Sequence, residues 1–213
     1  LGIGAYQMIT RTVYVNDLTF VAPGIETKAQ LFTALKDASY AGFTEDWKVA
    51  PDSITKRMHR RFSPQTLLAI LTAEKIAPGL ADNAAWVFGS AFGEGETLQV
   101  ILEALRTPNM AIRPTRFQNS VHNAASGQWT IAQGIQNAAT SICAGDCRAA
   151  YFFNMSTDLA KLEQRDVGLV LFDAPLPYPL DGSHPVSVPV GAGLALSPHG
   201  GPQTIATLEF DLV

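Results

Sequence analysis

"TSICAGDCRAAYFF" (Thr140–Phe153) contains three kinds of local structure in succession. Its β-branched and apolar beginning predicts a buried strand, Ala144 and Gly145 predict a sharp turn, and the apolar residues at its end predict a helix. A strand, a tight turn and a helix form the arrangement in which many enzymes present a nucleophile. Asp146 lies at this turn, and Cys147 follows one residue later. The function of the chain therefore depends on what these two residues do.

The predicted helix from Cys147 to Leu162 is apolar on nearly every side over its first two turns. A helix that is apolar all round is expected to be buried all round. One sheet of about five strands covers only one side of it, and a chain of 213 residues is too short to supply a second sheet of equal size. We therefore expect a partner or a second copy of the chain to cover the other side.

The sequence on either side of this stretch alternates strands and helices, which predicts an α/β fold. Further strands are predicted at 12–23, 84–93, 167–174, 191–197 and 203–213. Further helices are predicted after a capping-box pattern at Thr27, after Ser63-Pro64, and over 95–108 and 120–138. No low-complexity linker interrupts this order, so we expect a single domain over residues 1–213. We expect Met8 to be the native start, with residues 1–7 as foreign residues in front of it.

Composition argues against several classes of protein. The apolar runs are interrupted well before the roughly 20 residues that a membrane-spanning helix requires, and the first residues lack the features of a signal peptide. A net charge of −4 argues against nucleic acid as a partner. Cys143 and Cys147 have no second cysteine pair or histidine at metal-ligand spacing. We expect a soluble cytoplasmic protein without a metal or cofactor.

The basic cluster "KRMHRRF" begins at Lys56 and includes Arg57, Arg60 and Arg61. Such a cluster is typical of a solvated face, and in an acidic protein it also suits an acidic partner. Both interpretations remain open from the sequence.

A longer stretch, "IRPTRFQNSVHNAASGQWTIAQGIQNAATSICAGDC", resembles the segment of β-ketoacyl synthases that leads into their nucleophile turn. "RDVGLVLFDA", "VGAGLALSP" and the N-terminal "VYVNDLTFVAPGIETKAQLFTAL" also resemble strands and a helix of that family. The resemblance implies the thiolase-like fold, of which this chain corresponds to the N-terminal half. In that half a mixed sheet of about five strands has helices on both faces.

Two departures from the family pattern bear on activity. Active ketosynthases carry a cysteine at the turn, where this register has Asp146, and a carboxylate does not form the stable acyl thioester that their reaction needs. The family's two catalytic histidines belong to the second half of the fold, and none of the histidines of this chain matches them. The resemblance therefore implies a non-catalytic subunit similar to the chain-length factors of type II polyketide and aryl polyene systems. A purely structural role for Asp146 is to cap the N-terminus of the following helix.

The resemblance also implies partners and site residues. In the family, subunits pair through the strand before the turn, here Thr140, Ser141, Ile142 and Cys143. In the family each subunit also contributes residues to the floor of its neighbour's acyl tunnel, and in this chain these residues would be Phe92, Phe117 and Gln118. We expect a full-length, active β-ketoacyl synthase as the partner, and an acyl carrier protein at the basic cluster Lys56–Arg61.

Two alternatives remain. A free-standing acyl-thioester hydrolase or transferase could use Cys147 or Asp146 together with His122, a residue that otherwise suits the core or an interface. The chain could instead be a structural scaffold whose pocket is closed.

Overall fold

The computed structural model describes residues 9–37, 47–145, 148–179, 181–183 and 186–212. The strands are β1 (Ile9–Val21), β2 (Ala85–Ser90), β3 (Ala139–Cys143), β4 (Val167–Asp173), β5 (Val190–Ser197) and β6 (Ala206–Leu212). The α-helices are α1 (Lys28–Lys36), α2 (Lys56–His59), α3 (Pro64–Ile76), α4 (Gly95–Arg106), α5 (Pro114–Gln118), α6 (Ala124–Gln133) and α7 (Arg148–Glu163). Short 3-10 helices follow at Ala77–Gly79 and Asp181–Ser183.

The strands form one mixed sheet in the order β3-β2-β4-β5-β1-β6. β2 is parallel to both β3 and β4, whereas β5 is antiparallel to its neighbours β4 and β1. The expected mixed α/β sheet is confirmed, but it has six strands rather than about five. The reason is that β6, the last predicted strand, pairs with β1 along its whole length and so joins the same sheet.

Two of the predicted helix starts are confirmed by their capping contacts. At α1, the Thr27 backbone N–H donates to Gln30 Oε1, and the Gln30 backbone N–H donates to Thr27 Oγ1. At α3, the backbone N–H of Thr66 donates to Ser63 Oγ at 2.9 Å, and Pro64 takes the first helical position. These residues satisfy N–H groups that have no partner inside the helix.

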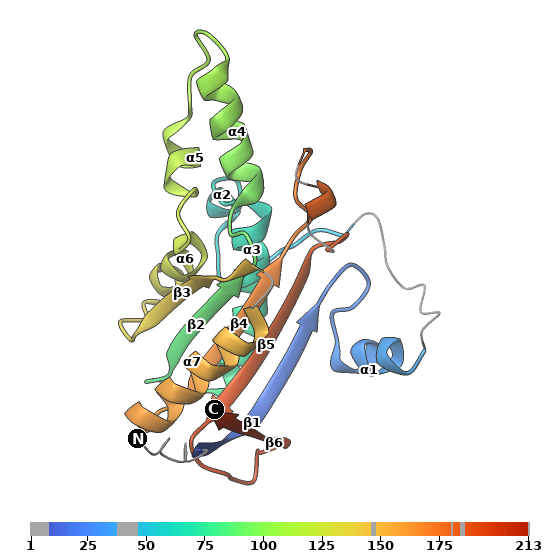
Figure 1. Cartoon of the computed structure of the whole chain (residues 1–213), viewed down its shortest axis with the longest axis vertical. Helices are drawn as coiled ribbons and strands as arrows, with labels where there is room; N and C mark the ends of the chain where they lie inside the picture. Colours follow the sequence, from blue (N-terminus) through green and yellow to red (C-terminus); the bar gives the residue numbers. More distant parts are fainter. Residues whose placement is uncertain (1–8, 38–46, 146–147, 180, 184–185, 213) are drawn as a thin grey trace, which may run out of the picture.

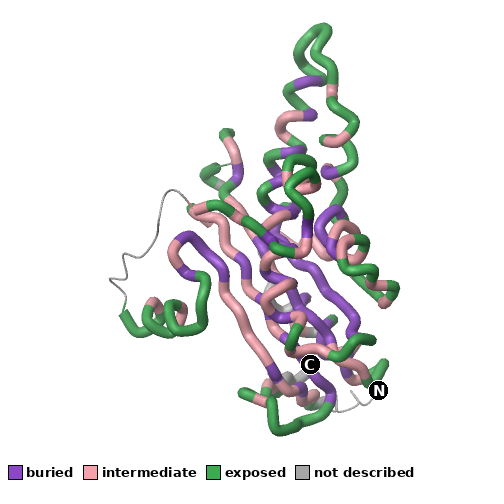
Figure 2. The backbone as a smooth tube through the Cα atoms, turned by 180° about the vertical axis from the view of Figure 1, so that it is seen from behind, coloured by how far each residue is buried: buried purple, intermediate pink, exposed green. Residues whose placement is uncertain are grey.

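Helices cover both faces of the sheet (Figure 1). On one face α3 and α6 pack against alternate strand residues that include Trp86, Phe88 and Val170. On the other face α7 packs against the residues between them, such as Val87 and Leu169. Because successive side chains of a strand point to opposite faces, strands with apolar residues in succession supply both cores. Figure 2 shows the buried residues concentrated along the middle of the sheet.

The described residues of α7 are buried on one side only. Phe152 and Ala160 are enclosed against the sheet, whereas Met155 is exposed and Leu162 is 76% exposed. The expectation that this helix is buried all round is therefore not met within the chain itself. The sheet covers only one side of α7, so a second protein surface would be needed to cover the exposed side.

α4 and α5 extend beyond the end of the sheet at which β2 and β3 terminate (Figure 1). They pack against each other, with their exposed residues concentrated toward the tip (Figure 2). The sequence did not predict α2 or α5, because helices of four and five residues carry no readable periodicity.

Candidate functional site

The loop of residues 91–94 joins β2 to α4 and lies at the carboxyl ends of the parallel strands. The backbone N–H of Ala91 donates to Asp173 Oδ1 at 2.9 Å, and the backbone N–H of Gly93 donates to Ser90 Oγ at 3.0 Å. Gly93 has a φ of +59°, a left-handed conformation that favours glycine. In sheets of this kind the carboxyl ends of parallel strands are the usual place for a binding site.

The same loop is bonded to the beginning of the predicted nucleophile turn. The backbone N–H of Ala144 donates to the Ser90 carbonyl at 3.3 Å, and that of Gly145 donates to the Ala91 carbonyl at 3.2 Å. Gly145 has a φ of +51°, which agrees with the predicted break after β3. Asp146 and Cys147 themselves lie outside the described residues. Their roles as nucleophile position or helix cap stay predictions.

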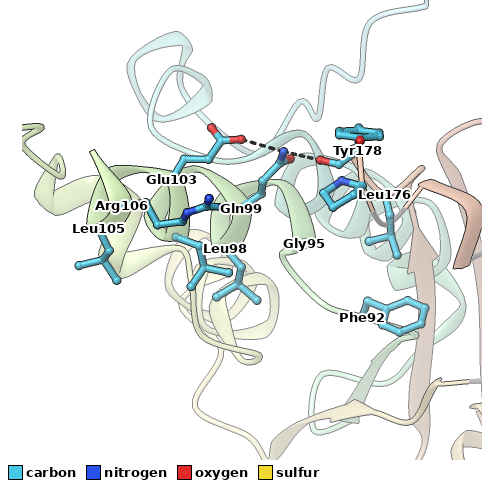
Figure 3. A pocket seen from close by; sticks show the side chains of 11 residues that line it. Phe92, Gly95, Leu98, Gln99, Glu103, Leu105, Arg106, Leu176 and Tyr178 are labelled. Atoms are coloured by element: carbon cyan, nitrogen blue, oxygen red, sulfur yellow. Dashed lines mark hydrogen bonds between the residues drawn. The ribbon is translucent and has the colours of Figure 1, made fainter. Parts of the chain in front are cut away.

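An apolar groove of about 850 Å³ runs along α4 from this loop (Figure 3). Phe92 lies at one end, and the groove continues past Leu98, Leu102 and Leu105 of α4. Its opposite wall is formed by Leu176, Tyr178 and Pro179. A Cβ on Gly95 would lie 2.6 Å from Leu176 Cδ2, so the absence of a side chain there lets this wall approach the helix. The groove has the character of a site for an apolar chain or an apolar partner surface.

Hydrogen bonds hold the two walls of the groove together at its rim. Gln99 Nε2 donates to the Tyr178 carbonyl at 2.6 Å and to Glu103 Oε1 at 2.9 Å (Figure 3). The segment that carries Tyr178 is thereby tied to the middle of α4. This contact was not predicted, because Gln99 and Tyr178 are far apart in the chain.

The predicted tunnel residues occupy two separate places. Phe92 lines the groove, as described above. Phe117 and Gln118 lie on α5, where Phe117 is 67% exposed, and neither belongs to the lining of the groove. The chain alone therefore does not bring Phe92 and Phe117 into one cavity, and the shared tunnel floor stays a prediction.

The predicted pairing strand, β3, lies at an edge of the sheet and has β2 as its single described neighbour. Thr140, Ser141, Ile142 and Cys143 are partly exposed. Ser141 Oγ lies 2.7 Å from Ser126 Oγ of α6. Burial raises the pKa of the Cys143 thiol, which also lies 3.5 Å from Ser90 Oγ. This shift disfavours the thiolate, the form of cysteine that acts as a nucleophile.

His122 is exposed in the structure, so it is not a core residue. Its ring approaches the loop: a Cβ on Gly93 would lie 3.1 Å from His122 Nδ1 and 3.3 Å from Cys143 Sγ. Both side chains thus lie against the loop at the sheet end where the turn begins.

Four arginines surround a hollow of about 180 Å³ between the start of α3 and α5. Arg60 and Arg61 come from the predicted basic cluster, Arg113 immediately precedes α5, and Arg116 lies in the middle of α5. Glu96 also lines the hollow. The sequence reasoning missed Arg113 and Arg116 because the fold, and not their spacing, brings them to the cluster. We refer to this site as the arginine hollow.

Glu94 is a buried acid that the sequence reasoning also missed. Its carboxylate accepts hydrogen bonds from Ser63 Oγ and Thr66 Oγ1, each at 2.7 Å, and from Thr97 Oγ1 at 3.3 Å. Burial raises the pKa of Glu94, the three hydroxyl donors oppose that shift, and the charge of Glu96 adds to it. The sequence feature that could have pointed to Glu94 is its position between Gly93 and Gly95, with the apolar Phe92 directly before them.

No group of three metal-ligating side chains occurs among the described residues. None of the helices in the described part of the chain has the length and apolar character needed to cross a membrane.

A six-stranded mixed sheet with helices on both faces is the arrangement of the thiolase-like fold. The family model described as the N-terminal domain of β-ketoacyl synthase matches residues 38–211. The chain belongs to this family. No curated protein sequence matches it.

Several solved structures have the same fold. One is a complex of the ketosynthase ApeO with its chain length factor ApeC from Xenorhabdus doucetiae, at a TM-score of 0.77 and 23% identity over 89% of this chain and 80% of that one. Another is the ishigamide ketosynthase/chain length factor, at a TM-score of 0.72 and 14% identity over 87% of this chain and 62% of that one. A third is the AntDE:AntF complex, a type II acyl carrier protein with its ketosynthase, at a TM-score of 0.71 and 14% identity over 88% and 62%.

Proposed function

We propose that this chain is a non-catalytic ketosynthase-like subunit that pairs with an active β-ketoacyl synthase and helps to set the length of its product. The reaction would be chain elongation of the aryl polyene, polyketide or fatty acid type. The register with Asp146 at the nucleophile position supports the lack of catalysis, because a carboxylate cannot carry the acyl chain as a stable thioester. In this proposal residues 1–213 act as a single cytoplasmic domain.

The observation that carries the role in chain length is the apolar groove that begins at Phe92. An acyl chain that grows along α4 would contact Leu98 and Leu102, and the ring of Phe92 would limit the space at the end of the groove nearest the strands. A fixed aromatic ring discriminates chain lengths because each additional methylene must either fit or displace it.

The partner would pair with β3 through Thr140, Ser141, Ile142 and Cys143. An edge strand presents unpaired N–H and C=O groups, and pairing with another subunit satisfies them. The exposed leucines of α4 and the outer side of α7 would be covered in the same complex. Phe117 and Gln118 on α5 could then complete a tunnel floor that the isolated chain does not form.

An acyl carrier protein would dock at the basic cluster Lys56–Arg61. The arginine hollow supports this proposal, because Arg113 and Arg116 add charge to the cluster in a chain whose net charge is −4. A concentrated basic patch on an acidic protein attracts an acidic partner without promoting general association.

The proposal is tested by isolating the tagged protein from its source cells and measuring the mass of the complex in solution. We expect a one-to-one complex with a ketosynthase that has an intact cysteine. Asp146→Asn and Cys147→Ala should each leave the activity of the complex unchanged, with the partner's own cysteine variant as the inactive control. A protein that turns over acyl thioesters without a partner and loses this activity in either variant would contradict the proposal.

The second candidate is a free-standing acyl-thioester enzyme that uses Cys147 or Asp146. The position of the exposed His122 against Gly93, at the sheet end where the turn begins, favours this candidate over a closed scaffold. His122→Ala distinguishes a free-standing enzyme from a chain-length subunit. The enzyme would lose its turnover, whereas the chain-length subunit would leave the activity of its partner unchanged.

A further inference from the structure

Glu94 connects the loop after β2 with the beginnings of α3 and α4. It is 4% exposed and is the last residue of the loop before α4. Two of its hydroxyl donors, Ser63 and Thr66, belong to the beginning of α3, and the third, Thr97, belongs to the first turn of α4. The three hydroxyl groups offset part of the cost of burying this carboxyl group.

The orientation of these hydrogen bonds is fixed by the cap of α3. Ser63 Oγ accepts the backbone N–H of Thr66 at 2.9 Å, so its own hydrogen is free to donate to Glu94. Thr66 Oγ1 donates to the same carboxylate oxygen. A carboxylate accepts from several donors at once and thereby links the start of α3 to the start of α4.

Phe92 lies between two fixed points of the loop. On its N-terminal side the backbone N–H of Ala91 is bonded to Asp173. On its C-terminal side the backbone N–H of Gly93 donates a hydrogen bond to Ser90 Oγ. The carboxylate of Glu94 accepts a hydrogen bond from Ser63 at the start of α3. The Glu94 carbonyl also accepts the N–H of Leu98, another residue of the groove. A displacement of Glu94 would thus move both Phe92 and the first turn of α4.

We propose that Glu94 is a positioning residue for the apolar groove: through Ser63, Thr66 and Thr97 it fixes the loop that carries Phe92 and the start of α4. The consequence for product length rests on the function proposed above. Loss of the carboxylate would leave Phe92 attached but mobile, and the groove would then admit a wider range of chain lengths.

The first test uses the isolated chain and needs no partner. Amide hydrogen exchange is measured for wild type, Glu94→Ala, Glu94→Gln and the surface control Glu209→Gln. In Glu94→Ala we expect roughly tenfold faster exchange in 91–98, with β4 unchanged, because only the local opening is affected. Glu94→Gln should stay close to wild type, since its amide retains an acceptor for Ser63 and Thr66. Unchanged exchange in 91–98, or equally faster exchange throughout the chain, would overturn the proposal.

Thr66→Val provides a second variant if Glu94→Ala does not fold. It removes one donor to Glu94 from a fully buried position and conserves the volume of the side chain. We expect faster exchange in the same segment, by a smaller factor than in Glu94→Ala. Exchange identical to wild type would contradict the role of the hydroxyl cluster.

The second test measures product lengths in the complex with the partner ketosynthase, with Phe92→Ala as the reference. We expect Glu94→Ala to broaden the distribution in the direction that Phe92→Ala shifts it, with little change in total product, and Glu94→Gln to restore the wild-type distribution. If Phe92→Ala shifts the distribution and Glu94→Ala does not, the positioning role is wrong and the proposed function stands. If Phe92→Ala has no effect, the proposed function fails, and the exchange rates alone decide the role of Glu94.

Discussion

α3 and α4 are helices of similar length, 13 and 12 residues, and both are rich in leucine, isoleucine and alanine, yet the fold uses them differently. Leu68 and Ile70 of α3 are fully enclosed between the sheet and α6. Leu102 and Leu105 of α4 are 60% and 72% exposed and line the groove. Apolar residues on a helix that projects from the sheet contribute little to the stability of the chain alone. Exposed apolar residues grouped in this way are typical of a binding surface.

The largest effect is expected for Leu68→Ala in α3. Leu68 is fully buried, and its removal leaves a cavity against the sheet. A loss of about 2 to 5 kcal/mol in the free energy of unfolding is expected for such a substitution. Urea denaturation measures it. The matched variant Leu102→Ala should change stability by less than about 0.5 kcal/mol, as surface substitutions do. A similar loss in both variants would contradict the distinction between the two helices.

The second prediction concerns the binding role of α4. Leu102→Ser combined with Leu105→Ser should weaken the complex with the partner or the acyl chain roughly tenfold or more, because two exposed leucines would no longer be buried on binding. Isothermal titration or native mass spectrometry gives the affinity, and the melting temperature of the isolated chain should not fall. Lys28→Ser on the remote helix α1 is the control. Unaltered affinity would show that Leu102 and Leu105 have no role in binding.

The third prediction concerns the arginine hollow beside α5. Arg113→Glu with Arg116→Glu should slow association with the carrier protein roughly tenfold at low ionic strength, and the difference should shrink as salt is added. Surface plasmon resonance over a salt series measures both effects. Charge reversal at Arg165, which pairs with Glu163 away from the hollow, serves as the control. Equal sensitivity at the two places would indicate a nonspecific effect of charge.

The fourth and smallest effect is the pH dependence of stability caused by Glu94. Burial raises the pKa of Glu94 in the folded chain. As the pH rises above the ordinary pKa of a glutamate, the unfolded chain therefore loses this proton before the folded chain does. The stability that this group contributes is present in acid and is lost as the pH rises through the folded pKa. Glu94→Gln cannot ionise, so its stability relative to wild type should increase from pH 4 to pH 8. A difference that is constant or decreases over this range would contradict the prediction, which thermal melts at each pH can measure.

Much of the fold could be predicted because local signals agree with it. Ser63-Pro64 marks the start of α3, and the apolar runs at 167–174 and 191–197 become β4 and β5. The number of strands in the sheet was underestimated, since no local pattern says that β6 pairs with β1. Strand pairing between distant segments is decided by the tertiary structure, which the sequence periodicity does not contain.

The candidate site was predicted less completely. Phe92 was assigned to an acyl tunnel from a resemblance, and that role stays a prediction; in the chain alone Phe92 lines the apolar groove. Glu94 was not predicted, because its significance comes from Ser63 and Thr66, which lie about 30 residues earlier and reach it only through the packing of α3. The arginine hollow was half predicted for the same reason. When a site is assembled from several elements, sequence patterns do not predict which of its residues lie together.

The central claim is that this chain sets the length of a product that its partner makes. The most direct measurement is the product profile of the reconstituted pair with wild-type chain and with Phe92→Ala, determined by liquid chromatography and mass spectrometry. The account predicts a similar total amount of product with a shift toward longer chains in Phe92→Ala, and no product from the chain without its partner. An unchanged length profile, or product formed by this chain alone, would contradict it.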